Sequence, residues 1–224
     1  MLYSEKVKLF AKQHPCEEIT VDGARYRYVL CGKAGARTLV FLNGGMVAQI
    51  YVQKYPGEAG GLILVSTGGM DEATLRTLKQ KYRLAPLMLW YMKHCNYEKL
   101  KPKLISASLR HIRDETPEEI AYAKDIFETT FRDFTQEKDV HISGLLADLM
   151  RQKPVTAADF AALAGRILLI LPNQDFFSEK MQKDLIALMH DPKIAYVSGG
   201  HLSTVLKTQD YVRVIREFLT ETFA

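Results

Sequence analysis

Residues 38–49 constrain the fold of this chain more than any other stretch. They contain an apolar run at 39–42, a turn with two glycines, and then a helical pattern. A strand-length apolar run that ends in a glycine turn and leads into a helix is typical of the first half of a βαβ unit. A second apolar run follows at 62–66, and a right-handed crossover would place it parallel to the first. The sequence therefore predicts the start of a parallel sheet.

The same alternation returns near the end of the chain. Residues 166–171 form a continuous apolar run, the pattern of a strand covered on both faces, and 193–197 form the last strand. Near the start, two strand-like runs flank Asp22-Gly23, a strong hairpin signal because glycine tolerates positive φ. The predicted fold class is α/β: a shortened, mostly parallel sheet with an antiparallel N-terminal hairpin and a helical cap insertion.

The insertion covers residues 71–164, which show several helical patterns and no convincing strand. Its clearest helix start is Thr116-Pro-Glu-Glu119, with a Thr cap, a Pro at the first position and a Glu that returns the capping bond. We expect residues 1–70 and 165–224 to form the core domain and 71–164 the cap. We interpret the cap's large apolar side chains mainly as core between cap and sheet, with an apolar substrate pocket as the alternative. They are Leu84, Leu87, Met88, Leu89, Trp90, Tyr91, Phe127, Phe131 and Phe134.

Composition excludes several classes of protein. A chain of 224 residues that is 47% hydrophobic suits one core, and its +4 charge forms no basic run that would indicate nucleic-acid binding. Three cysteines without C-x-x-C spacing predict neither a disulfide framework nor a zinc site, and we expect no metal. The glycine turns match no nucleotide-binding motif, so no cofactor is expected. Without a leader pattern or a spanning segment, we expect a cytoplasmic protein with no membrane partner.

Four segments end at the edge of a parallel sheet where ligands gather: Asn43-Gly44-Gly45, Ser66, Asp175 and His201. A carboxylate and an imidazole delivered there by successive strands suit an acid–base pair, in which the Asp fixes the imidazole tautomer. The alternative is that Asp175 makes only a local Asx turn and His201 is a surface loop residue. Spacing alone leaves both interpretations open.

The chain resembles α/β-hydrolases of the proline-iminopeptidase and esterase kind. The similar features are the opening hairpin, the stretches at 39–45 and 61–66, the helical insertion, residues 167–175 and the histidine turn at 197–202. The resemblance implies that Asp175 is the acid of a catalytic triad and His201 its general base. It also implies a small apolar substrate or ligand.

The sequence departs from this family at the nucleophile, because no G-x-S-x-G motif occurs in the 224 residues. If Gly44-Gly45-Met46 is the end of the nucleophile turn, Leu42 occupies the serine's place. If Asn43-Gly44-Gly45 is the oxyanion-hole loop, the nucleophile turn is missing. Ser66 is a weak candidate for a substitute nucleophile.

Three functions therefore remain open. The first is a hydrolase relative with impaired or no turnover, and the second is an active ester or amide hydrolase with an unassigned serine. The third is a binding protein for an apolar ligand or a partner. Both alignments of the glycine turn suggest that about two βα units are missing from the middle of the sheet. We therefore also expect self-association, because the loss of their covering helices would expose apolar surface.

Overall fold

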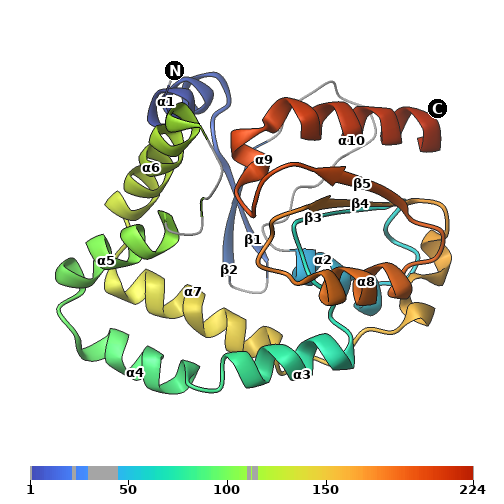
Figure 1. Cartoon of the computed structure of the whole chain (residues 1–224), viewed down its shortest axis with the longest axis horizontal. Coiled ribbons are helices and arrows are strands. Elements are labelled where there is room, and N and C mark those ends of the chain that lie inside the picture. The colour runs from blue at the N-terminus through green and yellow to red at the C-terminus, as the bar shows by residue number, and fades with distance from the viewer. Residues whose placement is uncertain (1, 22–23, 30–44, 110–111, 113–115, 224) are drawn as a thin grey trace.

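The computed structural model describes residues 2–21, 24–29, 45–109, 112 and 116–223 (Figure 1). Within these ranges, three strands form a parallel sheet in the order β3-β4-β5. They are β3 (Leu62–Val65), β4 (Ile167–Pro172) and β5 (Lys193–Val197). Two further strands, β1 (Glu17–Val21) and β2 (Ala24–Tyr28), pair antiparallel in a sheet of their own. The strand expected at 38–42 lies outside the described residues, so its pairing with β3 stays a prediction.

Strand β4 is the centre of the molecule. All six of its residues are buried, as its unbroken apolar sequence predicts. Leu168 and Ile170 belong to one apolar cluster, whereas Ile167, Leu169 and Leu171 belong to another. Because successive side chains of a strand point to opposite faces, each cluster lies on its own side of the sheet.

Helices cover both faces of this sheet (Figure 1). Side chains of α2 (Gly45–Lys54), α8 (Glu179–Leu188) and the 3-10 helix η1 (Ala157–Leu163) join the cluster of Ile167. Helix α10 (Thr208–Phe223), which follows the short α9 (Ser203–Leu206), packs on the opposite face. The apolar residues of this helix recur at i, i+3, i+4, i+7 and i+8 and form one stripe that faces the sheet. The buried members of the stripe are Tyr211, Val214 and Phe218, with Ile215 and Leu219 partly buried beside them.

The segment between β3 and β4 contains no strand in its described part and consists of successive helices. They are α3 (Glu72–Lys81), α4 (Ala85–His94), α5 (Tyr97–Leu109), α6 (Pro117–Arg132), α7 (Gln136–Leu149) and then η1. The start predicted for α6 is confirmed. Thr116 Oγ1 accepts from Glu119 N at 3.2 Å, and Glu119 Oε2 accepts from Thr116 N at 2.8 Å. Helix α1 (Tyr3–Gln13) packs against α6, where Ser4 N donates to Asp125 Oδ2 at 2.8 Å.

The structure overturns our interpretation of α4 as core. Leu84, just before the helix, and four large side chains of α4 are more than half exposed: Leu87, Met88, Trp90 and Tyr91. The helix packs against α7, and only Ala85, Leu89 and Met92 are partly or fully buried. These three positions lie on one stripe of the helix. A helix that is apolar all round can bury only the stripe that faces its partner, which explains the difference. Phe127, Phe131 and Phe134 are half-buried.

A buried glutamine ties α2 to the segment after β3. The Gln49 side chain is fully buried, and its Nε2 donates to Gly68 O at 2.9 Å. Its Oε1 accepts from the buried Met70 N at 3.0 Å. The side chain therefore satisfies two backbone groups that no regular secondary structure pairs.

We expect Gln49→Leu to destabilise the fold although leucine fills about the same buried volume as glutamine. Met70 N–H would remain buried without a partner, at a cost of about 1 to 3 kcal/mol, whereas Gly68 C=O would keep its bond from the Thr67 hydroxyl at 3.2 Å. Chemical denaturation measures this difference in the free energy of unfolding. The exposed Gln80 supplies the control, Gln80→Leu, which should change stability by less than about 0.5 kcal/mol. Equal stability of the two variants would show that the Gln49 bonds contribute nothing.

Candidate active site

Backbone bonds hold together the two loops that leave β4 and β5. Asn173 N donates to Val197 O and Gln174 N donates to Gly199 O, both at 3.0 Å. The Asn173 side chain adds a third bond between the loops, in which its Oδ1 accepts from Gly199 N at 3.0 Å. Gly199 has φ +99°, which favours glycine at this position. These bonds place Asp175 and His201, which follow shortly in each loop, at the same edge of the sheet.

The expected contact between the acid and the imidazole is present. His201 Nδ1 and Asp175 Oδ1 lie 3.1 Å apart. Asp175 Oδ1 also accepts from Phe176 N at 2.7 Å and from Phe177 N at 3.5 Å, the latter in the pattern of an Asx turn. Asp175 therefore makes both the Asx turn and the contact with His201, because its Oδ1 takes part in each of them.

Burial differs sharply within this pair. The Asp175 side chain is 1% exposed, whereas the His201 side chain is 47% exposed. The imidazole stacks at a tilt against Phe176, with 4.5 Å between ring centroids, and Phe176 is itself half exposed. An acid that accepts from Nδ1–H leaves Nε2 as the ring's free acceptor. The pair thus has the arrangement of a general base held by a buried carboxylate.

Ser66, which follows β3, is buried and has no partner for its hydroxyl among the described residues. Its φ of +46° lies in the left-handed region, which is unusual for serine. The Ser66 hydroxyl lowers the pKa of the Tyr211 phenol. The Ser203 hydroxyl lowers it too, and its Oγ lies 2.6 Å from the Tyr211 oxygen. Burial nevertheless dominates and raises the pKa of Tyr211. Ser66 thus belongs to a buried hydroxyl cluster, and no hydrogen bond links it to His201.

The other oxygen of the acid, Asp175 Oδ2, is also buried without a partner among the described residues. Asp175 contributes to raising the pKa of Tyr211, so this carboxylate lies near the same hydroxyl cluster. From the sequence, Ser203 is a serine beside His201 that lies on no strand–turn–helix elbow, and Tyr211 is a position on the apolar stripe of the last helix. Only burial shows that the Tyr211 hydroxyl needs a partner.

Of the glycine turn expected at the site, Asn43 and Gly44 lie outside the described residues, and Gly45 opens α2. A Cβ atom on Gly45 would lie 2.6 Å from the Thr67 side chain. The start of α2 therefore approaches the end of β3 so closely that only glycine fits without a shift.

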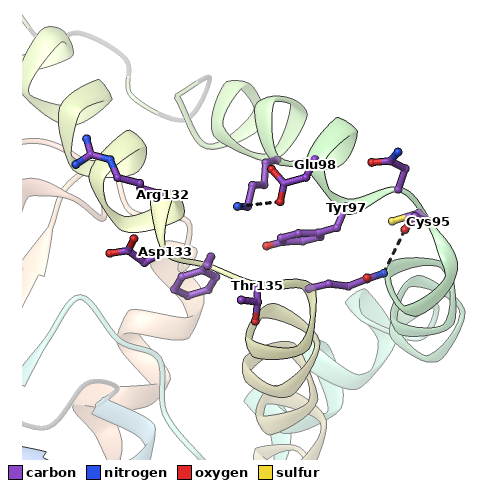
Figure 2. Close-up of a pocket in the computed structure, with 10 residues that line it drawn as sticks. Cys95, Tyr97, Glu98, Arg132, Asp133 and Thr135 are labelled. Carbon is purple, nitrogen blue, oxygen red and sulfur yellow. Dashed lines mark hydrogen bonds and ion pairs between the residues drawn. The ribbon is translucent and has the colours of Figure 1, made fainter.

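A separate open pocket of about 490 Å³ lies among the helices between β3 and β4 (Figure 2). Cys95, Asn96, Tyr97, Glu98, Lys101, Arg132, Asp133, Phe134, Thr135 and Gln136 line it. Many of its polar groups are already paired: Lys101 Nζ lies 3.1 Å from Glu98 Oε1, and Tyr97 OH donates to Asp139 Oδ2 at 2.8 Å. Burial and this bond raise the pKa of Tyr97. The pocket includes neither Asp175 nor His201, so it is the weaker candidate for chemistry.

The described ranges contain neither a metal-binding cluster nor a membrane-spanning helix. No group of three or more His, Cys, Asp or Glu side chains there lies close enough to hold a metal ion. No helix in that part of the chain is long and apolar enough to cross a membrane.

Comparison with solved structures identifies the architecture. A protein described as a non-heme bromoperoxidase, BpoC from Mycobacterium tuberculosis H37Rv, superposes with a TM-score of 0.56 and 14% sequence identity. The match covers 81% of this chain and 65% of that one. A hydrolase from Pseudomonas aeruginosa PA01 gives a TM-score of 0.55 at 16% identity over 79% of this chain and 61% of that one. The fold is α/β-hydrolase-like.

The likeness is one of fold alone. No family model matches the chain, and no curated protein matches it significantly. The chain spans less than two thirds of the length of these structures. The roles of Asp175 and His201 therefore have to be argued from their own geometry.

We expect Asp175→Asn to change the tautomer of His201. The carboxylate accepts from Nδ1–H, whereas an amide can donate to Nδ1 instead and so favour protonation at Nε2. Two-dimensional ¹⁵N–¹H NMR of the imidazole distinguishes the tautomers. His190, whose Nε2 lies 2.9 Å from Ala157 O, should keep its Nε2–H form in both proteins and serves as the internal control. An unchanged His201 spectrum would show that the contact is not formed in solution.

Proposed function

We propose that this chain is an α/β-hydrolase-type protein that retains an acid–base pair, Asp175 and His201, but lacks the nucleophile that such a pair normally serves. Hydrolysis of esters and amides is then impaired or absent. One observation carries the proposal: a buried carboxylate orients the imidazole, yet no serine hydroxyl is hydrogen-bonded to that ring among the described residues.

The absence of a nucleophile would prevent His201 from acting as a general base. In a serine hydrolase the imidazole acts by taking the proton of the attacking hydroxyl, so the nucleophile must lie within hydrogen-bond reach of the base. Without it, only the residual effects of binding and transition-state stabilisation remain. In addition, the single turn Asn43-Gly44-Gly45 cannot provide both the nucleophile turn and the second oxyanion loop. The half-exposed Phe176 beside His201 suits a small apolar ligand at this edge.

A second candidate function is an active ester or amide hydrolase with Ser66 as nucleophile. The left-handed conformation of Ser66 favours it, because a family nucleophile sits on a strained turn at the end of a strand. Burial of the hydroxyl beside Tyr211 argues against it, since the substrate and His201 would both have to reach Oγ. We therefore rank it below the inactive form.

We expect no measurable turnover of p-nitrophenyl esters or amino-acid arylamides and no labelling by a fluorophosphonate. His201→Ala should then leave the background rate unchanged, because the base has no nucleophile to activate. Steady-state absorbance assays and gel fluorescence of the labelled protein measure both results.

The variant Ser66→Ala separates the two candidates. Turnover that disappears in both His201→Ala and Ser66→Ala, together with labelling that Ser66→Ala abolishes, would establish Ser66 as the nucleophile and contradict the proposal.

A further inference from the structure

The outer side of α4 forms an apolar surface that no described part of the chain covers. We define this α4 surface by Leu84, Leu87, Met88, Trp90 and Tyr91. Leu87 is 62% exposed and Trp90 is 59% exposed. Single exposed apolar residues are ordinary, but five large ones on and next to one helix mark a site of interaction.

Positive charge flanks this surface along the chain. Residues 79–103 contain seven lysine or arginine side chains and a single acidic one, Glu98. This excess of six exceeds the +4 of the whole chain, so the rest of the protein is net negative. Lys79, Lys81 and Arg83 precede the α4 surface, and Lys93 and Lys99 follow it, all of them exposed. The basic residues therefore flank the apolar helix at both ends.

Exposed apolar side chains flanked by positive charge favour some binding partners of the α4 surface over others. Two copies of this surface facing each other would bring two strongly positive segments together, which opposes a symmetric dimer. An exposed side with Leu, Trp and Tyr, preceded and followed by basic residues, suits a segment that lies in the interface of an anionic bilayer. Trp and Tyr favour the headgroup level, and lysines favour negatively charged lipids.

We propose that the α4 surface docks on a membrane surface rich in anionic phospholipid, without spanning it. The helix is held from behind by α7, to which Gln136 Nε2 contributes by donating to Cys95 O at 3.2 Å. It therefore presents its outer side as part of a rigid body. The sequence-based expectation of no membrane partner rested on the lack of a leader pattern and of a spanning segment, and docking on a membrane surface requires neither.

Docking here would also bring the membrane near the candidate site. Lys81, at the end of α3, lies with its Nζ 5.6 Å from the centre of the Phe176 ring, which in turn stacks on His201. Figure 1 shows α3 leading directly into α4 along the outer edge of the helical segment. The basic residues that precede the α4 surface therefore reach the candidate site through Lys81.

Trp90 provides the test, because it is the only tryptophan in the chain and lies in the proposed surface. Vesicles of phosphatidylcholine mixed with phosphatidylglycerol should shift its emission to shorter wavelength, and added salt should reverse the shift. Vesicles of phosphatidylcholine alone should bind much more weakly. A second measurement, flotation of the protein with vesicles, should agree.

Variants on and off the surface sharpen the test while Trp90 stays in place. Leu87→Ser should weaken partition into the anionic vesicles by roughly tenfold, since it removes an inserted apolar side chain. Lys93→Gln should weaken it about fivefold, since each cation near an anionic surface contributes on that scale. Tyr196→Ser, which removes a 68% exposed aromatic on β5, should bind like the unaltered protein.

Four outcomes would overturn the proposal. The first three are no emission shift with anionic vesicles, equal partition into phosphatidylcholine vesicles alone, and unchanged vesicle binding by Leu87→Ser. The fourth is a shift that depends on protein concentration without lipid, which would assign the surface to a second copy of the chain. A shift with an acidic polypeptide such as polyglutamate, but not with vesicles, would instead assign it to an acidic protein partner.

Discussion

The burial of β4 on both faces is the constraint on which the rest of the structure depends. A strand without exposed residues needs a neighbour on each edge and a helical layer on each face, because its side chains alternate between them. Strands β3 and β5 supply the edges, α2 and α8 one layer and α10 the other. The parallel register of β3 with β4 is kept although roughly a hundred residues of helix separate them in the chain.

The candidate site is a consequence of this sheet. Parallel strands end at one edge, and the bonds from Asn173 to Val197 and Gly199 fix the relative position of the two loops. A buried carboxylate then meets a half-exposed imidazole with little further machinery. The contact between Asp175 and His201 forms within the consecutive elements β4, α8 and β5. Because these elements can form the pair by themselves, an intact acid–base pair gives no assurance of activity, and the proposal of impaired hydrolysis rests on that independence.

The helices between β3 and β4 pack differently from those that cover the sheet. They pack through narrow stripes, α4 on α7 and α5 on α6, and leave large apolar side chains in contact with solvent. A docking surface and a core stripe have the same composition, so hydrophobicity alone cannot tell them apart. In this chain the basic residues that precede and follow α4 supply the distinction, together with the measured exposure of its side chains.

The sequence by itself determined the strands at 62–65, 167–172 and 193–197, the capped start of α6, the apolar stripe of α10 and the edge where Asp175 and His201 meet. These features follow from local rules: periodicity, capping and the direction of parallel strands. Only the tertiary structure decided that Gln49 is a buried link, that Ser66 lies with Tyr211 rather than with His201, and that α4 faces outward. Each depends on which face of an element meets a neighbour from a distant part of the chain. That choice is made by packing over the whole chain, and no local pattern encodes it.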